Sequence, residues 1–317
     1  MASPQKLTGL RPQAYEHPSD TAALNALTSV KGFDTLIRKL NSWSFDRLLR
    51  VQLTGSFLRV TPDSFSDLHE LLVQACSILD LPTLPELYIG GTGLNAFTAC
   101  VEHPLIMLYS GAVDTLTTEE LLFVIAHEVG HIKSGHVLYY QIAEFIPIIG
   151  EIIGAATLGF GEWLSAPLQL ALMHWQRMSE FTADRAGLLA CQDADSALRT
   201  MMKLAGLPQK YFKDVNTQDF IEQAREFKTM EGEKLNMIAK WLSTMGATHP
   251  WTVLRAQHLL QWVESGEYDK VLQAPQRIPQ PVQPGISKFC DQCGNPLTGK
   301  EMFCTSCGKQ LPRSLTR

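Results

Sequence analysis

The stretch that most constrains this chain is the pentapeptide from His127 to His131, which has the pattern His-Glu-x-x-His. Residues four apart lie on the same face of an α-helix, one turn from each other, so both imidazoles can reach a single metal ion. Neutral imidazole suits zinc, and Glu128 could act as general base toward a water molecule at the metal. The pattern therefore predicts a metal-binding helix.

The residues around the pentapeptide indicate that this helix is buried. Thr117 and Glu120 have the spacing of a capping box, which marks the first turn of a helix. Most of the following residues are apolar: Leu121, Leu122, Val124, Ile125, Val129 and Ile132. A buried helix would not carry two histidines and a glutamate without partners for them. The alternative, a chance match on a solvated helix, is therefore disfavoured.

A further metal ligand is expected elsewhere, because a catalytic zinc uses three protein ligands and keeps one position open. Glu180 and Asp184 are the candidates, four residues apart on a second expected helix. One carboxylate could ligate zinc, and the other could accept the free ring N–H of a ligating histidine and so fix its tautomer. The alternative is an exposed charged face on which either carboxylate contacts Arg185.

Taken together, several motifs resemble one known family, the gluzincin metallopeptidases of the HtpX-like and CAAX-prenyl-protease type. The similarity spans roughly residues 50 to 260 and rests on the stretches 94–97, 104–111, 127–131, 180–185 and 248–250. The resemblance implies that zinc is bound by His127, His131 and Glu180, that the general base is Glu128, and that a ligating histidine is oriented by Asp184.

The same resemblance implies roles for residues outside the metal site. His249, taken alone, is typical of a loop or capping histidine, but its match to the family makes it a candidate for stabilising the tetrahedral oxyanion. Asn95, Ala96 and Phe97 would lie on an edge strand facing the cleft and bind an extended peptide by β-addition. Asn95 could equally be a turn residue at the strand end. Arg255 is expected to have a structural or cleft-charge role.

Apolar periodicity and the resemblance together predict an α+β fold, with a mainly helical zincin-like metallopeptidase domain, a small antiparallel sheet and a small C-terminal zinc ribbon. Strands are expected at 86–89, 94–101 and 105–109. The expected parts of the chain are a loose N-terminal arm (1–19), the metallopeptidase domain (20–273, with an N-terminal helical part at 20–80), a Pro-rich linker (274–288) and the zinc ribbon (289–312).

The expected ribbon carries two Cys-x-x-Cys-Gly knuckles, whose thiolates are Cys290, Cys293, Cys304 and Cys307. Four thiolates complete a tetrahedron, which predicts a closed, structural zinc site, and so short a segment would depend on the metal to fold. Disulfides are the alternative. An excess of basic residues suits a protein-docking module. The three remaining cysteines stand in apolar surroundings and are expected in the core: Cys76, Cys100 and Cys191.

The segment 137–173 is apolar, yet glutamates at 144, 151 and 162 and two prolines interrupt it. It lacks the roughly 18 uncharged residues in a row that a membrane-spanning helix prefers. We expect a buried helical pair near the cleft, with membrane association through this segment as the alternative.

Charge and composition narrow the remaining possibilities. A net charge of −5 does not favour a nucleic-acid partner. The first residues lack the charged-then-apolar order of a signal peptide, so a cytoplasmic protein is expected, with membrane association as the alternative. The sequence thus predicts an endopeptidase with one catalytic and one structural zinc, acting on protein or peptide substrates, with a role in protein quality control. The alternative is a zinc-dependent scaffold without turnover, which has no need of the intact Glu128.

Overall fold

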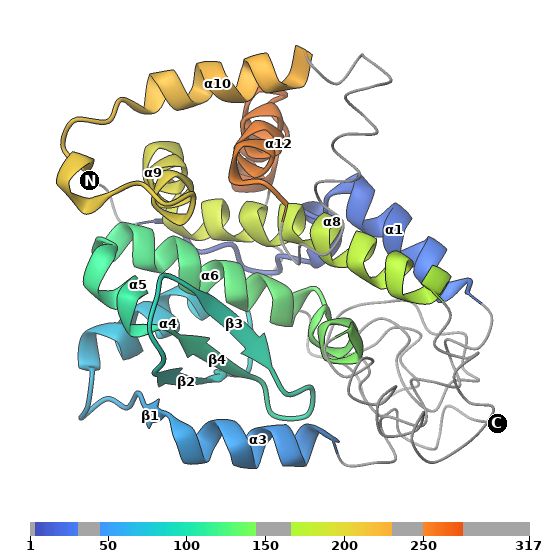
Figure 1. Cartoon of the computed structure of the whole chain (residues 1–317), viewed down its shortest axis with the longest axis vertical. Coiled ribbons are helices and arrows are strands. Elements are labelled where there is room, and N and C mark those ends of the chain that lie inside the picture. Colours follow the sequence, from blue (N-terminus) through green and yellow to red (C-terminus); the bar gives the residue numbers. More distant parts are fainter. Residues whose placement is uncertain (1–3, 31–44, 144–165, 230–249, 275–317) are drawn as a thin grey trace.

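The computed structural model describes residues 4–30, 45–143, 166–229 and 250–274 (Figure 1). Helices dominate these residues and surround one small sheet, which confirms the expected α+β class. The helices are α1 (Pro18–Thr28), α3 (Phe45–Ser56), α4 (Ser66–Ile78), α5 (Ser110–Thr115), α6 (Thr118–Lys133), α8 (Ala166–Cys191), α9 (Ala194–Leu204), α10 (Thr217–Thr229), α12 (Thr252–Glu264) and α13 (Glu267–Gln273), with short 3-10 turns at Pro12–Ala14 and Gln209–Tyr211. The strands are β1 (Leu58–Arg59), β2 (Glu86–Ile89), β3 (Ala96–Ala99) and β4 (Leu105–Leu108).

The sheet has the strand order β1-β2-β4-β3. β4 pairs antiparallel with β3 and parallel with β2, so the sheet is mixed and not wholly antiparallel as expected. The reason is the insertion of β4 between β2 and β3, which makes β2 a neighbour of β4 and not of the strand that follows it. β3 is left at the sheet edge, as the family resemblance implied.

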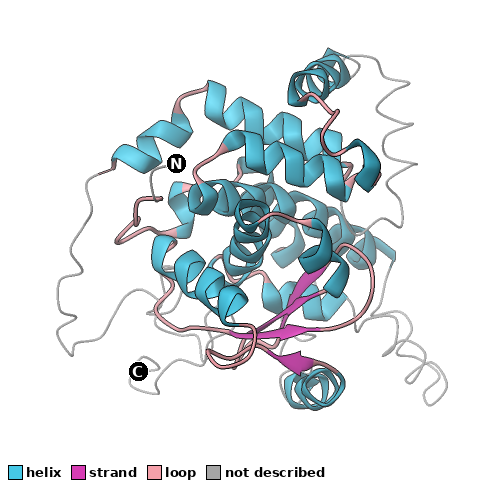
Figure 2. Cartoon of the chain, turned by 90° about the vertical axis from the view of Figure 1, so that its left-hand side faces the viewer, coloured by secondary structure: helices cyan, strands magenta, loops and turns pink. Residues whose placement is uncertain are grey.

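Side chains on both faces of the sheet are buried. Leu105 and Met107 of β4 pack with Leu53 of α3 on one face, while Ile106 and Leu108 join the main core on the other. Figure 2 shows the sheet between one helix on one side and the main body of helices on the other. β4 is therefore buried on both faces, which accounts for its uninterrupted run of apolar residues.

The N-terminal stretch from residue 4 onward is packed, which corrects the expectation of a loose arm over 1–19. Tyr15 is fully buried, and its hydroxyl lies 3.1 Å from the Ser134 hydroxyl just beyond α6. Leu7 is buried too, and its backbone N–H donates to the Ile78 carbonyl at 2.9 Å. A few buried apolar side chains hold this stretch in place. They show no helical periodicity, and the composition around them is polar and contains proline, so the sequence did not indicate their burial. α1 then packs along α8 (Figure 1).

The apolar segment 137–173 is only partly within the described residues. Residues 137–143 include several buried apolar side chains, and α8 begins at Ala166. The stretch 144–165 lies outside the described residues, so the expected helical pair stays a prediction. Within the described part of the chain, none of the helices combines the length and apolar character needed to span a bilayer. The three cysteines expected in the core are buried and free there: Cys76, Cys100 and Cys191.

Candidate metal centre

The helix that carries the pentapeptide, α6, begins as the sequence predicted. The Thr117 hydroxyl accepts from the Glu120 amide at 3.4 Å, and the Glu120 carboxylate accepts from the Thr117 amide at 2.8 Å, so the capping box is confirmed. Every residue of α6 from Glu120 to Lys133 is buried. A buried pair forms where Lys203 of α9 donates to Glu120 at 2.6 Å. This pair joins the first turn of α6 to α9.

The second helix of the site, α8, crosses α6 at very short range (Figure 1). A Cβ added at Gly130 would lie only 2.5 Å from the Cβ of Ala186, and one at Gly187 would lie 2.8 Å from the Phe123 ring. Glycine at these two positions lets the helix backbones approach closely. This close crossing brings Glu180 of α8 over the histidines of α6.

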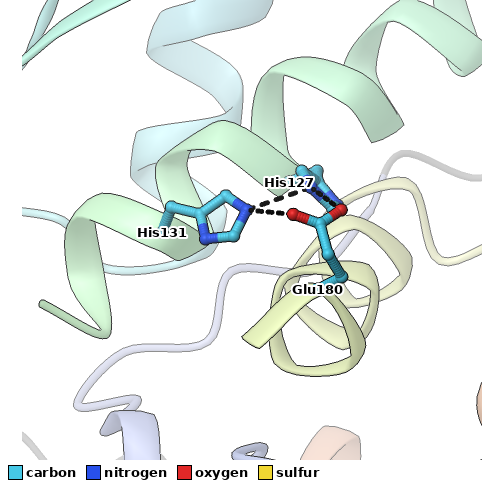
Figure 3. Close-up of side chains that lie close together, drawn as sticks. All are labelled: His127, His131 and Glu180. Atoms are coloured by element: carbon cyan, nitrogen blue, oxygen red, sulfur yellow. Dashed lines mark hydrogen bonds and ion pairs between the residues drawn. The ribbon is translucent and has the colours of Figure 1, made fainter. Parts of the chain in front are cut away.

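His127, His131 and Glu180 converge, and their side chains point toward one another (Figure 3). Their ligating atoms all lie within 4.8 Å of one another, and all three residues are buried. The two Nε2 atoms are 3.2 Å apart, and the Glu180 oxygens lie 3.5 Å from His127 Nε2 and 3.4 Å from His131 Nε2. Two imidazoles and one carboxylate form the donor set of a zinc site with an open fourth position.

The other ring nitrogen of His127 contacts a second carboxylate. Its Nδ1 lies 3.1 Å from an oxygen of Asp184, and Arg255 of α12 clasps that carboxylate with bonds of 2.8 and 2.6 Å. Arg255 also lies 3.3 Å from Glu180. Burial raises the pKa of Asp184, but Arg255 and His127 outweigh it and hold this pKa below its usual range. Because an ionised carboxylate only accepts hydrogen bonds, the Nδ1 of His127 carries a hydrogen.

The alternative of an exposed charged face is wrong for these two carboxylates, because Glu180 and Asp184 are both buried. That alternative required an ion pair between Arg185 and one of the two carboxylates. The Arg185 guanidinium instead donates to the backbone carbonyls of Tyr15 and Glu16 at 3.3 and 3.0 Å.

The electrostatics of the site favour a cation between the ligands. Burial lowers the pKa of His127, but hydrogen bonds to Asp184 and Glu180, and their charges, outweigh it and raise the pKa to about 9. In the neutral ring, Nε2 presents a lone pair to the Nε2 of His131 only 3.2 Å away. A proton or a metal ion relieves the repulsion between such lone pairs, so the residues present fit a bound zinc ion.

Glu128, the expected general base, is held by the edge strand. Thr98 of β3 donates to its carboxylate at 2.6 Å and lies 3.3 Å from its carbonyl oxygen. The strand packs against α6 (Figure 1). Asn95 is exposed, and its side chain accepts from the Ala96 amide at 2.9 Å, while Ala96 and Phe97 are half-buried. The expected substrate strand thus lies beside the expected base.

Several expected site residues lie outside the described residues. His249 is one, although the adjacent Pro250 is buried and α12, which carries Arg255, begins two residues later at Thr252. The ribbon thiolates are the others: Cys290, Cys293, Cys304 and Cys307. Their roles stay predictions.

The structure also brings together residues that sequence reasoning missed. The Tyr140 hydroxyl donates to Glu180 at 2.6 Å, Thr98 contacts Glu128, and His136 lies against His131. His136 had a usable signal, since it follows Gly135, and a glycine often marks the end of a helix. Tyr140 and Thr98 had none, because their partners are 40 and 30 residues away in the chain.

A mainly helical domain in which the H-E-x-x-H histidines and a glutamate from a second helix converge defines a metallopeptidase of the gluzincin class. Residues 62–263 match the model of peptidase family M48, and the chain belongs to this family. Members of the family are zinc-dependent, and the cluster of His127, His131 and Glu180 could bind that metal.

Curated relatives support the same assignment. The chain is 31% identical over 267 residues to the plastoglobule-localized metallopeptidase 48 of Arabidopsis thaliana, covering 83% of this chain and 76% of the relative. It is 28% identical to protease HtpX homolog 2 of Methanosarcina acetivorans over 49% of this chain and 60% of the relative. It is 22% identical to the metalloprotease YcaL of Escherichia coli, covering 51% and 56%. No solved structure matches the chain.

Proposed function

We propose that the chain is a zinc-dependent endopeptidase, with His127, His131 and Glu180 as metal ligands and Glu128 as general base. The observation that carries this proposal is the position of Glu128. Its carboxylate is on the same helix as two converging histidines and is tied by Thr98 to an edge strand. A site that only binds a metal has no use for a carboxylate that follows one ligand in the helix and is bonded to an edge strand.

Each residue has a separate task in the proposed reaction. Bound zinc would polarise the peptide carbonyl and make a neighbouring water molecule more acidic. Glu128 would take the proton of that attacking water and pass it to the leaving amine. Thr98 would keep the carboxylate in position through its 2.6 Å bond. His249 remains our candidate donor to the oxyanion.

The substrate would bind along β3. An edge strand has unpaired backbone groups, and an extended peptide can add to it as a further strand. Ala96 and Phe97 begin this edge strand, Asn95 directly precedes it, and Thr98 links it to Glu128. We therefore propose unfolded or extended segments of proteins as the substrate class, which suits a role in protein quality control.

The rest of the chain has a place in this proposal. The four cysteines of 289–312 would bind a structural zinc, and the ribbon would dock a partner or substrate protein. We propose a cytoplasmic location, with membrane association through 137–173 as the alternative. The names of the relatives, one plastoglobule-localized and several HtpX homologues, support that alternative.

A matched pair of variants tests the proposal. Glu128→Gln keeps the size and the Thr98 contact but removes the basic oxygen, so zinc content should stay unchanged while peptide turnover falls by roughly 100- to 10,000-fold. Glu180→Ala removes a ligand, so zinc content should fall together with turnover. Metal analysis and a casein or peptide-library assay on both proteins measure this. Wild-type-like turnover by Glu128→Gln, or full zinc in Glu180→Ala, would refute the assignment. A wild-type protein that binds zinc without cleaving any peptide would favour the scaffold alternative.

A further inference from the structure

A second series of buried polar groups begins at the ligand His131 and ends on the N-terminal helix. The Nδ1 atom of His131 lies 2.9 Å from the Nδ1 atom of His136, and the Nε2 atom of His136 lies 3.1 Å from Asp20 of α1. All three side chains are buried. One proposed zinc ligand is thus connected, through one intermediate ring, to a carboxylate more than a hundred residues earlier in the chain.

The position of Asp20 is fixed by donors from α8. Trp175 donates its indole N–H to one carboxylate oxygen at 3.0 Å, and the Thr182 hydroxyl lies 2.6 Å from the other. The same hydroxyl oxygen accepts from the backbone amide of His17 at 3.0 Å, which leaves its own proton for Asp20. Asp20 is therefore an acceptor held by α8, and the ring of His136 must present an N–H to it.

The hydrogen-bond direction then follows step by step. A neutral histidine has one N–H, and in His136 this hydrogen is on Nε2, facing Asp20. Its Nδ1 is consequently an acceptor, and the group it faces is the Nδ1 of His131. That nitrogen of His131 must supply the hydrogen. The Nε2 atom of His131 is left with a bare lone pair, directed toward Glu180 and His127.

The end of α6 delivers His136 to this place. The amide of Gly135 donates to the Ile132 carbonyl at 3.1 Å, and the amide of His136 donates to the His131 carbonyl at 3.0 Å. Gly135 has a φ of +73°. This pairing is the Schellman motif, which needs a residue with positive φ, usually glycine, just past the helix. The motif folds the chain back so that the ring of His136 meets the ring of His131 at a centroid distance of 5.2 Å.

We propose that His136 and Asp20 are positioning residues that hold His131 in the tautomer and orientation needed to bind zinc, as Asp184 and Arg255 do for His127. This inference rests on the proposed function. The two histidines differ in their support, because His127 donates to a carboxylate and His131 donates to a ring nitrogen of His136. Asp20 lies outside the residues 62–263 that match the family model, so the N-terminal helix contributes to the site from beyond the matched region.

The test measures zinc affinity of the full-length protein by competition with a chromophoric chelator. His136→Phe keeps a ring but removes the acceptor, and affinity at the His127–Glu180 site should fall by roughly 10- to 100-fold. His136→Asn places an amide oxygen near the former Nδ1 and should recover much of that loss. Asp20→Asn should weaken affinity as well, because an amide cannot accept from Trp175, Thr182 and His136 together. The absorption spectrum of the cobalt-substituted protein should change for His136→Phe and return toward wild type for His136→Asn.

Leu27→Ala is the matched control. Leu27 is fully buried on α1 in the same cluster as Trp175, so its loss loosens the packing of α1 without removing a hydrogen bond from the series. It should lower the thermal midpoint while zinc affinity stays at the wild-type level.

If affinity follows thermal stability alike in Leu27→Ala and Asp20→Asn, or if His136→Phe binds zinc like wild type, the inference is overturned. If His136→Phe does not fold, the zinc affinities of His136→Asn and Asp20→Asn decide. Weaker affinity in Asp20→Asn than in His136→Asn supports the inference, and equal affinity overturns it. A wild-type protein whose zinc content equals that of Glu180→Ala would instead refute the proposed function itself.

Discussion

Arg255 shows how single residues keep the metal centre in place. Its guanidinium contacts both Asp184 and Glu180 inside the core, where an uncompensated carboxylate would be strongly destabilising. Burial lowers the pKa of Arg255, but the two carboxylates outweigh it and raise that pKa, so the group stays charged. The sequence and the family resemblance offered only a structural or cleft-charge role for this arginine. Its partners are on another helix, and such pairs have no local pattern.

His17 gives a pH-dependent prediction at the same scale. Its Nδ1 accepts from the Ser19 amide at 3.1 Å and caps α1. Burial, together with Arg185 and His258, lowers its pKa from 6.5 to about 3, although Asp20 acts in the opposite direction. The unfolded chain therefore binds a proton at His17 between these pH values and the folded chain does not. Stability is fully present above pH 6.5 and should be lost as the pH falls from 6.5 toward 3.

The variant His17→Asn isolates this contribution. Asparagine caps helices well but does not titrate, so its unfolding equilibrium should change less with pH than that of wild type. The difference between the two should approach a factor of about ten per pH unit below the unfolded pKa. Denaturant unfolding of both proteins between pH 7.5 and 5 measures it. Parallel stability curves would show that His17 is protonated in the folded protein as readily as in the unfolded chain.

Among the elements, the crossing of α6 and α8 decides the site geometry, because the two histidines are on α6 and Glu180 is on α8. Both helices could be predicted, since apolar periodicity and the capping box of Thr117 and Glu120 are local signals. Three of the four strands, β2, β3 and β4, could be predicted as well. Their pairing could not, since nothing in the residues of β4 specifies β2 as its parallel neighbour. For the same reason Asp20 was missed, although Glu180 and Asp184 were found from their helical spacing.

Gly130→Ala tests the importance of this crossing. The added Cβ would stand 2.5 Å from the Cβ of Ala186, which is fixed to its helix and cannot rotate away. The helices must separate, and such overpacking costs about 1–3 kcal/mol, partly offset by the roughly 1 kcal/mol that alanine gains over glycine within a helix. Because the separation moves Glu180 away from both histidines, zinc affinity should fall more clearly than stability.

The compensating double variant is the control for this prediction. Gly130→Ala combined with Ala186→Gly returns the space to the crossing, so zinc affinity should recover relative to Gly130→Ala alone. A double-mutant cycle in zinc affinity and in unfolding free energy measures the coupling. Independent, additive effects of the two substitutions would mean that the crossing tolerates a methyl group without moving the ligands.

On the scale of the whole molecule, distant parts of the chain meet around α8. α1 and α12 both pack against it (Figure 1). They bring Asp20 to His136, which contacts the ligand His131, and Arg255 to Asp184, which contacts the ligand His127. The stretch from residue 4 to residue 274 therefore acts as one unit in its described parts, and the N-terminal residues belong to it. Composition alone suggested an arm because Leu7 and Tyr15 are too few to give a pattern. Their burial follows only from the complete fold.

The Pro-rich linker that we expect after this unit leads to the last prediction. All proposed catalytic ligands, and the match to the family, lie before residue 274. The four ribbon cysteines form a separate expected ligand set, shared with none of them. Full-length protein should therefore bind two zinc ions per chain, one exchangeable and open to water, the other closed and tied to folding.

A chain ending near Gly285 should keep one zinc and still cleave a short unstructured peptide. It should lose activity toward a folded substrate that the ribbon docks, because tethering raises the local concentration of a bound partner. Metal content and peptide turnover of both chains measure this. If truncation abolishes short-peptide cleavage while the remaining domain stays folded with its zinc, the ribbon is part of the active site, and the separation into two modules is wrong.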